Sequence, residues 1–223
     1  NGKGWFGIAK HDEQHLLLRY YLDDVKCTQA MLEQIRRMFD LDVDTAVVEQ
    51  HLANNGLADL ASSGVRIPGV WNTWEAGIRA ILGQQISVKA AITQLNTFVA
   101  QLGSQAAQAH GDNTFCYFPT PAQVAASDLS FLRMPQRRKE TIQRFAEYML
   151  THFDEHPSHW LALKGIGPWT INYAKIRGLS EPDCFLATDL VVKKAIAQRT
   201  GFDAEKLSPW GSYATFYCWK SMS

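Results

Sequence analysis

Residues 161–173, Leu-Ala-Leu-Lys-Gly-Ile-Gly-Pro-Trp-Thr-Ile-Asn-Tyr, form the pattern in this chain best suited to bind a charged ligand. Gly165 and Gly167 flank one apolar residue, which permits a tight turn and a close approach of the backbone to another molecule. Pro168 stands where a new helix would begin, because its missing N–H is not needed in a first helical turn. The free N–H groups at that helix start, with Lys164 beside them, predict a phosphate site.

Two other interpretations of the glycine pair are open at this point. A plain turn between two helices explains Gly-x-Gly equally well. A dinucleotide-binding fingerprint fits poorly, because no strand precedes the glycines and the pattern G-x-G-x-x-G is incomplete.

Asp189 is the carboxylate best placed for chemistry after this turn. It lies 22 residues after Gly167 and precedes the apolar run Leu190-Val191-Val192. From these residues alone it is most simply a helix N-cap, since Asp is favoured at that position. Asp183 is a competing carboxylate, but it lies in a loop that contains a proline.

The elements that must position these residues are mostly helical. Apolar residues recur at steps of three and four, which predicts helices. The segments with this pattern are 31–39, 74–82, 91–102, 129–134, 142–150 and 190–199. Residues 5–10 and 15–20 predict two short strands. Because two strands alone are marginally stable, they must pack on the helical body or belong to a sheet that is not fully present here. The rest of the chain predicts no further strand.

Composition and charge exclude several classes of protein. Hydrophobic residues make up 46% of the 223 residues and charged residues 20%, as in an ordinary globular chain. No apolar run approaches the roughly 18 residues that a membrane span requires. Lys+Arg and Asp+Glu both number 22, but residues 130–200 hold eleven basic and seven acidic residues. This imbalance fits one face turned to a polyanion, although a solvated helix surface explains it as well.

The cysteines favour no metal site. The shortest interval among Cys27, Cys116, Cys184 and Cys218 is 34 residues. Because no C-x-x-C pair exists, a zinc or iron–sulfur site built from close cysteines is not expected. Reduced thiols, with no signal peptide in the first residues, predict a cytoplasmic protein.

The whole block L-x-x-L-K-G-I-G-P-W-T-x-N-Y resembles the helix-hairpin-helix of the DNA glycosylase superfamily. The resemblance implies that the amides of Gly165, Ile166 and Gly167 hold a DNA phosphate. It also allows a structural Na+ or K+ at the hairpin carbonyls near Gly165, and no other cofactor. In the superfamily an aspartate follows the hairpin at the separation of Asp189, so the resemblance makes Asp189 the catalytic carboxylate.

Three features narrow the resemblance to the bacterial DNA-3-methyladenine glycosylase II family. Trp169 stands where strand-cutting relatives carry a nucleophilic lysine, so no lyase activity is expected. The endonuclease III and adenine glycosylase branches of the superfamily carry a four-cysteine cluster after this domain, and no such cluster follows the hairpin in this sequence. Residues 80–87, Ala-Ile-Leu-Gly-Gln-Gln-Ile-Ser, and 208–214, Ser-Pro-Trp-Gly-Ser-Tyr-Ala, resemble two segments of that family. Gln85 and Gly211 depart from it, because relatives have a leucine wedge and an arginine there.

The family implies a mainly α fold with two helical subdomains flanking a DNA-binding cleft. A short two-strand β remnant of an N-terminal sheet domain is expected over residues 1–24, and the glycosylase domain over residues 25–223. The expected subdomains are 73–181, which includes the hairpin 163–169, and 25–72 plus 182–223.

The resemblance implies a monofunctional glycosylase that flips alkylated bases, of the 3-methyladenine and 7-methylguanine type, out of double-stranded DNA and leaves an abasic site. A base alkylated at N3 or N7 is a cation, and aromatic side chains can hold it by stacking and cation–π attraction. The residues expected at the base are Trp169, Tyr173, Trp219 and Gln84. Those expected on the DNA, besides the hairpin, are Gln85, Lys164 and Lys193. The protein is expected to act as a monomer, without a membrane, at the bacterial nucleoid.

Other interpretations stay open. Ordinary core packing also explains the three aromatic residues, since large aromatics dominate cores. The chain could excise another damaged base such as 8-oxoguanine, bind DNA through the hairpin without catalysis, or serve as a helical scaffold for protein partners. Base release together with salt-sensitive binding to duplex DNA would distinguish an enzyme from the last two.

Overall fold

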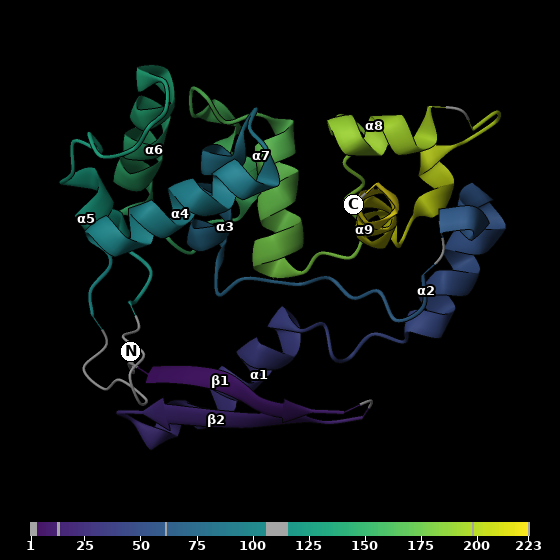
Figure 1. Cartoon of the computed structure of the whole chain (residues 1–223), viewed down its shortest axis with the longest axis horizontal. Coiled ribbons are helices and arrows are strands. Elements are labelled where there is room, and N and C mark those ends of the chain that lie inside the picture. Colours follow the sequence, from purple (N-terminus) through teal and green to yellow (C-terminus); the bar gives the residue numbers. More distant parts are fainter. Residues whose placement is uncertain (1–3, 13, 61, 106–115, 198, 223) are drawn as a thin grey trace.

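The computed structural model describes residues 4–12, 14–60, 62–105, 116–197 and 199–222 (Figure 1). Its N-terminal part is an antiparallel ribbon of β1 (Gly4–His11) and β2 (Leu16–Leu22), with Trp5 opposite Tyr21 and an irregularity between Ile8 and Lys10. The ribbon confirms the two predicted strands. Figure 1 shows it beside α1, below the other helices.

Helices form most of the remaining described chain, which confirms the mainly α fold. They are α1 (Thr28–Met38), α2 (Thr45–Leu52), α3 (Thr73–Gly83), α4 (Val88–Leu102), α5 (Pro121–Ala125), α6 (Gln136–Met149), α7 (Pro168–Ala174), α8 (Leu190–Ile196) and α9 (Gly211–Ser221). Shorter helical turns include η4 (Pro157–Ala162) before α7 and η5 (Lys175–Leu179), which continues α7. Within the described residues, no helix is long and apolar enough to cross a membrane.

The buried apolar side chains form two clusters. The first lies among α3, α4, α6 and α7, where the rings of Trp74 and Phe145 stack at 5.3 Å and Trp160 packs edge-on against Phe145 at 4.7 Å. The second lies among α2, α8 and α9 and includes Leu52 and Tyr217, both almost fully buried. Figure 1 shows these two groups of helices side by side, with the chain after α7 crossing from the first group to the second.

Residues 129–134 form turns and bends, so the helix predicted there is wrong. Leu129 has a φ of +54°, in the left-handed region that a helix does not use. The hydroxyl of Ser127 accepts the N–H of Leu129 at 3.1 Å, which holds the turn locally. Leu129 and Leu132 are nevertheless buried. The apolar spacing therefore reflects leucines buried in a loop and not the apolar face of a helix.

Helix α9 shows why periodicity alone does not predict every helix. Its residues Gly211–Thr215, Tyr217 and Cys218 are all buried, so the helix has apolar or small residues around most of its circumference. A helix buried around most of its circumference lacks the narrow apolar stripe from which amphipathic helices are recognised.

Candidate active site and hairpin

The hairpin between η4 and α7 has the backbone geometry that its glycines predict. Gly165 has a φ of +98°, which glycine adopts without strain. The N–H of Ile166 donates to the carbonyl of Leu163 at 3.0 Å, and the Ile166 side chain is buried in the first cluster. Gly167 is the N-cap of α7 and Pro168 its first residue, as predicted.

The hairpin is held against α6 by a close contact. A Cβ on Gly165 would lie 2.2 Å from the hydroxyl oxygen of Thr141 on α6, so only glycine fits there. In addition, Nη1 of Arg144 donates to the carbonyl of Lys164 at 2.7 Å. These contacts fix the position of the hairpin relative to α6.

Gln84 holds the other side of the hairpin. It caps the end of α3, and its Nε2 donates to the carbonyl of Gly165 and to Oγ1 of Thr170, both at 3.2 Å. The structure therefore places Gln84 in the contact between α3 and the hairpin. Its role at the base, which the sequence predicts, stays a prediction.

The Na+ or K+ that the resemblance allows at the hairpin carbonyls stays a prediction. The carbonyls of Leu163, Lys164 and Gly165 each accept a hydrogen bond from within the chain. The donor at Lys164 is the guanidinium of Arg144, which already brings a positive charge to this turn. No function is assigned to an ion here. In the described residues, no group of three His, Cys, Asp or Glu side chains could hold a metal.

Asp189 is the N-cap of α8 and also a contact for two tryptophans. Its Oδ1 accepts the backbone N–H groups of Val191 and Val192 at 2.9 and 3.1 Å. The same oxygen accepts the indole N–H of Trp219 at 3.1 Å, and Oδ2 accepts that of Trp169 at 3.0 Å. With four donors on two oxygens, this half-buried carboxylate is held in a single orientation.

The three predicted aromatic residues lie together at this carboxylate. Trp169 and Tyr173, one helical turn apart on α7, stack with ring centroids 5.2 Å apart and an interplanar angle of 25°. Trp219 from α9 lies 6.5 Å from Tyr173, and Phe216 packs edge-on against it at 5.0 Å. All four side chains are half-buried. The group Asp189, Trp169, Tyr173 and Trp219, here termed the aromatic site, thus joins residues from α7, α8 and α9.

Arg177 lies on the inner side of the aromatic site and was not singled out from the sequence. Its guanidinium carbon lies 5.9 Å from the centroid of the Tyr173 ring and 5.8 Å from that of Phe216. Burial lowers the pKa of Arg177. Its spacing of four residues from Tyr173 on one helix is the signal that could have revealed this contact.

The remaining predicted residues take different positions. Gln85 is exposed between α3 and α4 with a φ of +57°. Lys164 is exposed on the hairpin, and Lys193 is exposed in the last turn of α8. The competing carboxylate, Asp183, accepts a hydrogen bond from the hydroxyl of Ser208 at 2.6 Å. This bond holds Asp183 near the start of α9.

Gly211, where relatives have an arginine, is explained by its packing. A Cβ at this position would lie 2.9 Å from Oδ1 of Asp183 and 2.9 Å from the backbone nitrogen of Phe185. Because backbone lies on that side, a larger residue would require the loop before α8 to shift.

Comparisons with known proteins identify relatives of this chain. The family described as "AlkA N-terminal domain" matches residues 1–72. DNA-3-methyladenine glycosylase 2 of Escherichia coli is 32% identical over 95% of this chain and 78% of its own length. A protein of Mycobacterium tuberculosis named a probable bifunctional transcriptional activator/DNA repair enzyme AlkA is also 32% identical, over 93% of this chain. The chain spans only 46% of the length of that relative.

A solved structure supports the same fold. The 3-methyladenine DNA-glycosylase from Archaeoglobus fulgidus superposes with a TM-score of 0.73 at 19% identity, over 91% of this chain and 77% of that one. The sequence match to the Escherichia coli protein and the shared helical architecture together show that the chain belongs to the AlkA family of DNA-3-methyladenine glycosylases.

Proposed function

We propose that this chain is a monofunctional DNA glycosylase that hydrolyses the N-glycosidic bond of alkylated bases in double-stranded DNA. The substrates proposed are 3-methyladenine and 7-methylguanine, and the product strand carries an abasic site. The observation that carries the proposal is that the carboxylate of Asp189 accepts hydrogen bonds from the indole N–H groups of both Trp169 and Trp219. A carboxylate fixed beside a group of aromatic rings suits a cationic base and a sugar that becomes cationic.

The aromatic site would hold the base after it leaves the duplex. Flipping costs a few kcal/mol of stacking and pairing, which contacts in the site must offset. The ring faces of Trp169, Tyr173 and Trp219 attract a positively charged π-system. A base alkylated at N3 or N7 already carries that charge and is a good leaving group, so the site needs no acid to protonate it.

Asp189 would act on the sugar. As the bond from C1′ to the base breaks, the electron pair leaves with the base, which departs neutral, and positive charge develops on the sugar. A fixed carboxylate near C1′ stabilises that charge more in the transition state than in the ground state. Water then forms the new bond to C1′ and releases a proton. Asp189 can also orient this water through Oδ2, which accepts one hydrogen bond from Trp169 and has room for a second donor.

Strand cleavage is not proposed for this chain. A lyase step needs an amine to attack C1′ and form a Schiff base. At the position where strand-cutting relatives have a lysine, this chain has Trp169, whose indole N–H is bonded to Asp189. The neighbouring Thr170 and Ile171 are buried and carry no amine.

The hairpin would hold the DNA. The amides of Gly165 and Gly167 and the charge of Lys164 would bind a phosphate, and Gln85 would enter the minor groove. The amide of Ile166, which the sequence also predicts at the phosphate, donates to the carbonyl of Leu163 at 3.0 Å instead. Lys193 at α8 would contact a second part of the backbone. We expect the protein to act as a monomer in the bacterial cytoplasm.

Single-turnover release of 3-methyladenine and 7-methylguanine from methylated duplex DNA tests the proposal. We expect free base and an abasic strand that stays intact until it is treated with alkali. Strand cleavage without alkali would contradict the monofunctional assignment. Salt-sensitive binding without any base release would instead favour a non-catalytic DNA-binding module or another damaged base as substrate.

A further inference from the structure

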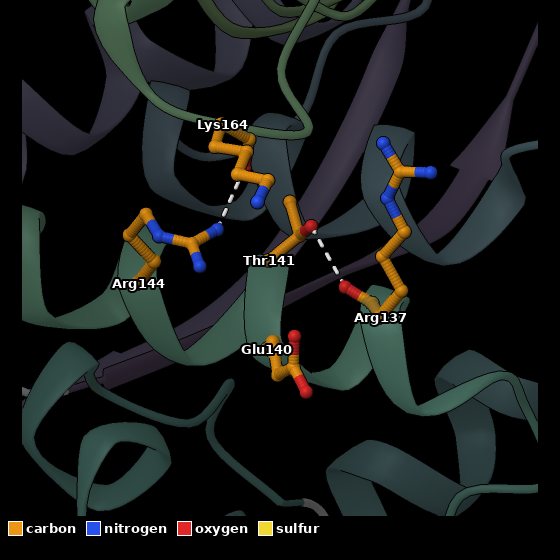
Figure 2. A pocket seen from close by; sticks show the side chains of 5 residues that line it. All are labelled: Arg137, Glu140, Thr141, Arg144 and Lys164. Carbon is orange, nitrogen blue, oxygen red and sulfur yellow. Dashed lines mark hydrogen bonds between the residues drawn. The ribbon is translucent and has the colours of Figure 1, made fainter.

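A hollow of about 320 Å³ lies beside the hairpin, between it and α6 (Figure 2). Its walls come from two segments of the chain. Helix α6 supplies Arg137, Glu140, Thr141 and Arg144, and the hairpin supplies Lys164. Three of these five side chains are cations and one is a carboxylate.

The three cations are available to a ligand. Across the described part of the chain, no carboxylate lies within 4.0 Å of a nitrogen of Arg137, Arg144 or Lys164. Figure 2 shows Arg144 and Lys164 extending toward each other beside Thr141, while the Glu140 carboxylate points to the opposite side. The hollow therefore has an excess of positive charge.

The hollow is held in a fixed position relative to the hairpin. Gly165 packs against Thr141, and one guanidinium N–H of Arg144 donates to the carbonyl of Lys164 at 2.7 Å. The hydroxyl of Thr141 donates to the carbonyl of Arg137 at 3.0 Å, so it is engaged within α6. Half-burial of Arg144 further limits its side-chain freedom. An anion in the hollow would thus lie at a set distance from one on the hairpin.

We propose that this hollow is a second phosphate subsite, which binds a phosphodiester of the same DNA that the hairpin binds. The planar guanidinium groups of Arg137 and Arg144 match the oxygens of a phosphate, and Lys164 adds a point charge. No aromatic ring lines the hollow, so it reads the backbone and not a base. The inference rests on the function proposed above and extends the DNA interface from the hairpin onto α6.

The salt dependence of DNA binding tests this subsite. The probe is a fluorescein-labelled duplex with one tetrahydrofuran site, and its affinity is measured across a KCl series for wild type and four variants. Arg137→Gln is expected to reduce the slope of log K against log[KCl] by about 0.9, the value for one phosphate contact. Lys164→Gln is expected to cause a loss of similar size. Arg137→Lys, which keeps the charge, should retain most of the slope.

Lys26→Gln is the matched control, because Lys26 is an exposed lysine in η1 (Val25–Cys27), the short turn just before α1. Figure 1 shows α1 apart from α6. It removes one positive charge and should leave the slope and the base release unchanged. If Arg137→Gln keeps the wild-type slope while wild type still releases base, the subsite is wrong and the proposed function stands. Lys164→Gln does not decide this point, because Lys164 also belongs to the hairpin phosphate site. If wild type neither binds the duplex nor releases base, both proposals fail. Thermal melting of each variant shows that the compared proteins are folded.

Discussion

The indole nitrogen of Trp169 lies 3.0 Å from Oδ2 of Asp189. The residue that would stack on the flipped base is therefore bonded to the residue that would stabilise the charged sugar. Trp219 repeats this arrangement on the other oxygen of Asp189. Because base and sugar are joined by the bond that breaks, a rigid link between their two binding groups holds that bond in one place.

Removing one indole donor should lower the rate without removing the ring. Trp169→Phe keeps an aromatic face against Tyr173 but loses the N–H bonded to Asp189. A hydrogen bond to a charged group contributes about 1.5–3 kcal/mol, so we expect single-turnover excision to fall roughly 10-fold or more. Binding to duplex DNA should change little. Trp210→Phe is the control, because it is the same substitution at a tryptophan packed against the second apolar cluster. Equal rates for Trp169→Phe and wild type would show that the hydrogen bond is not used.

Replacing the third aromatic residue should alter which bases are excised. Trp219→Ala removes a ring face whose attraction to a cation exceeds its attraction to a neutral base. We expect a larger loss of excision on 7-methylguanine, which is cationic, than on hypoxanthine, which is neutral. The measurement is the single-turnover rate on each base in the same duplex. Equal losses on both would argue that Trp219 merely fills space.

The two hairpin glycines should differ in what alanine does to them. Gly165→Ala places a Cβ on Thr141 and forces a non-glycine residue to a φ of +98°, which costs about 1–3 kcal/mol of unfolding free energy. Gly167 has a φ of −118° and open space around its Cβ position. Gly167→Ala should therefore fold normally and weaken DNA binding, because the new methyl group lies where the phosphate approaches. Urea unfolding and duplex titration separate the two effects. Unchanged DNA binding by Gly167→Ala would contradict the assignment of this turn to a phosphate.

The contacts of Glu181 with Lys175 and His156 should make the free energy of unfolding depend on pH. The carboxylate of Glu181 lies 2.8 Å from Nζ of Lys175 and 2.8 Å from Nε2 of His156. Burial alone would raise the pKa of Glu181, but the bonds from Lys175 and His156 outweigh it and lower the pKa below the ordinary value of 4.5. Stability from this carboxylate is therefore present above pH 4.5 and lost as the pH falls through the lowered pKa.

Glu181→Gln should reveal that dependence. At pH 7 we expect it to reduce the unfolding free energy by roughly 1 kcal/mol, since the ion pair with Lys175 and the hydrogen bond with His156 are both partly solvated. The difference from wild type should shrink as the pH drops below 4.5. Glu147→Gln, on an exposed residue of α6, is the control and should show no such trend. A difference that stays constant from pH 7 to acid would exclude the charge of Glu181 as its cause.

The sequence predicted the parts of the site that depend on short segments. Pro168 at the start of α7 and Asp189 at the start of α8 follow from local rules about which residues begin a helix. Only the family resemblance suggested that Trp169, Trp219 and Asp189 belong to one site. No local rule connects residues from three helices. The contact of Gln84 with the hairpin spans 81 positions and left no periodic signal.

One helix that was wrongly predicted, at 129–134, and one that was not predicted, α9, have the same physical origin. Residues 129–134 bury their leucines in a loop, and α9 is buried around most of its circumference. In both segments burial is set by tertiary packing, whereas apolar spacing indicates only how many sides of a regular helix face a core.

Asp189→Asn tests the central claim most directly. Asparagine keeps an oxygen to cap α8, but it loses the negative charge and places an NH2 group against one of the two indole donors. Asp44→Asn is the matched control, because Asp44 caps α2 in the same way through the N–H groups of Ala46 and Val47. The measurement is single-turnover release of 7-methylguanine at saturating enzyme, with duplex binding measured in parallel. The account predicts that Asp189→Asn binds the duplex like wild type and loses at least about 100-fold in rate, while Asp44→Asn keeps its rate. Asp189→Asn releasing base at the wild-type rate would contradict it.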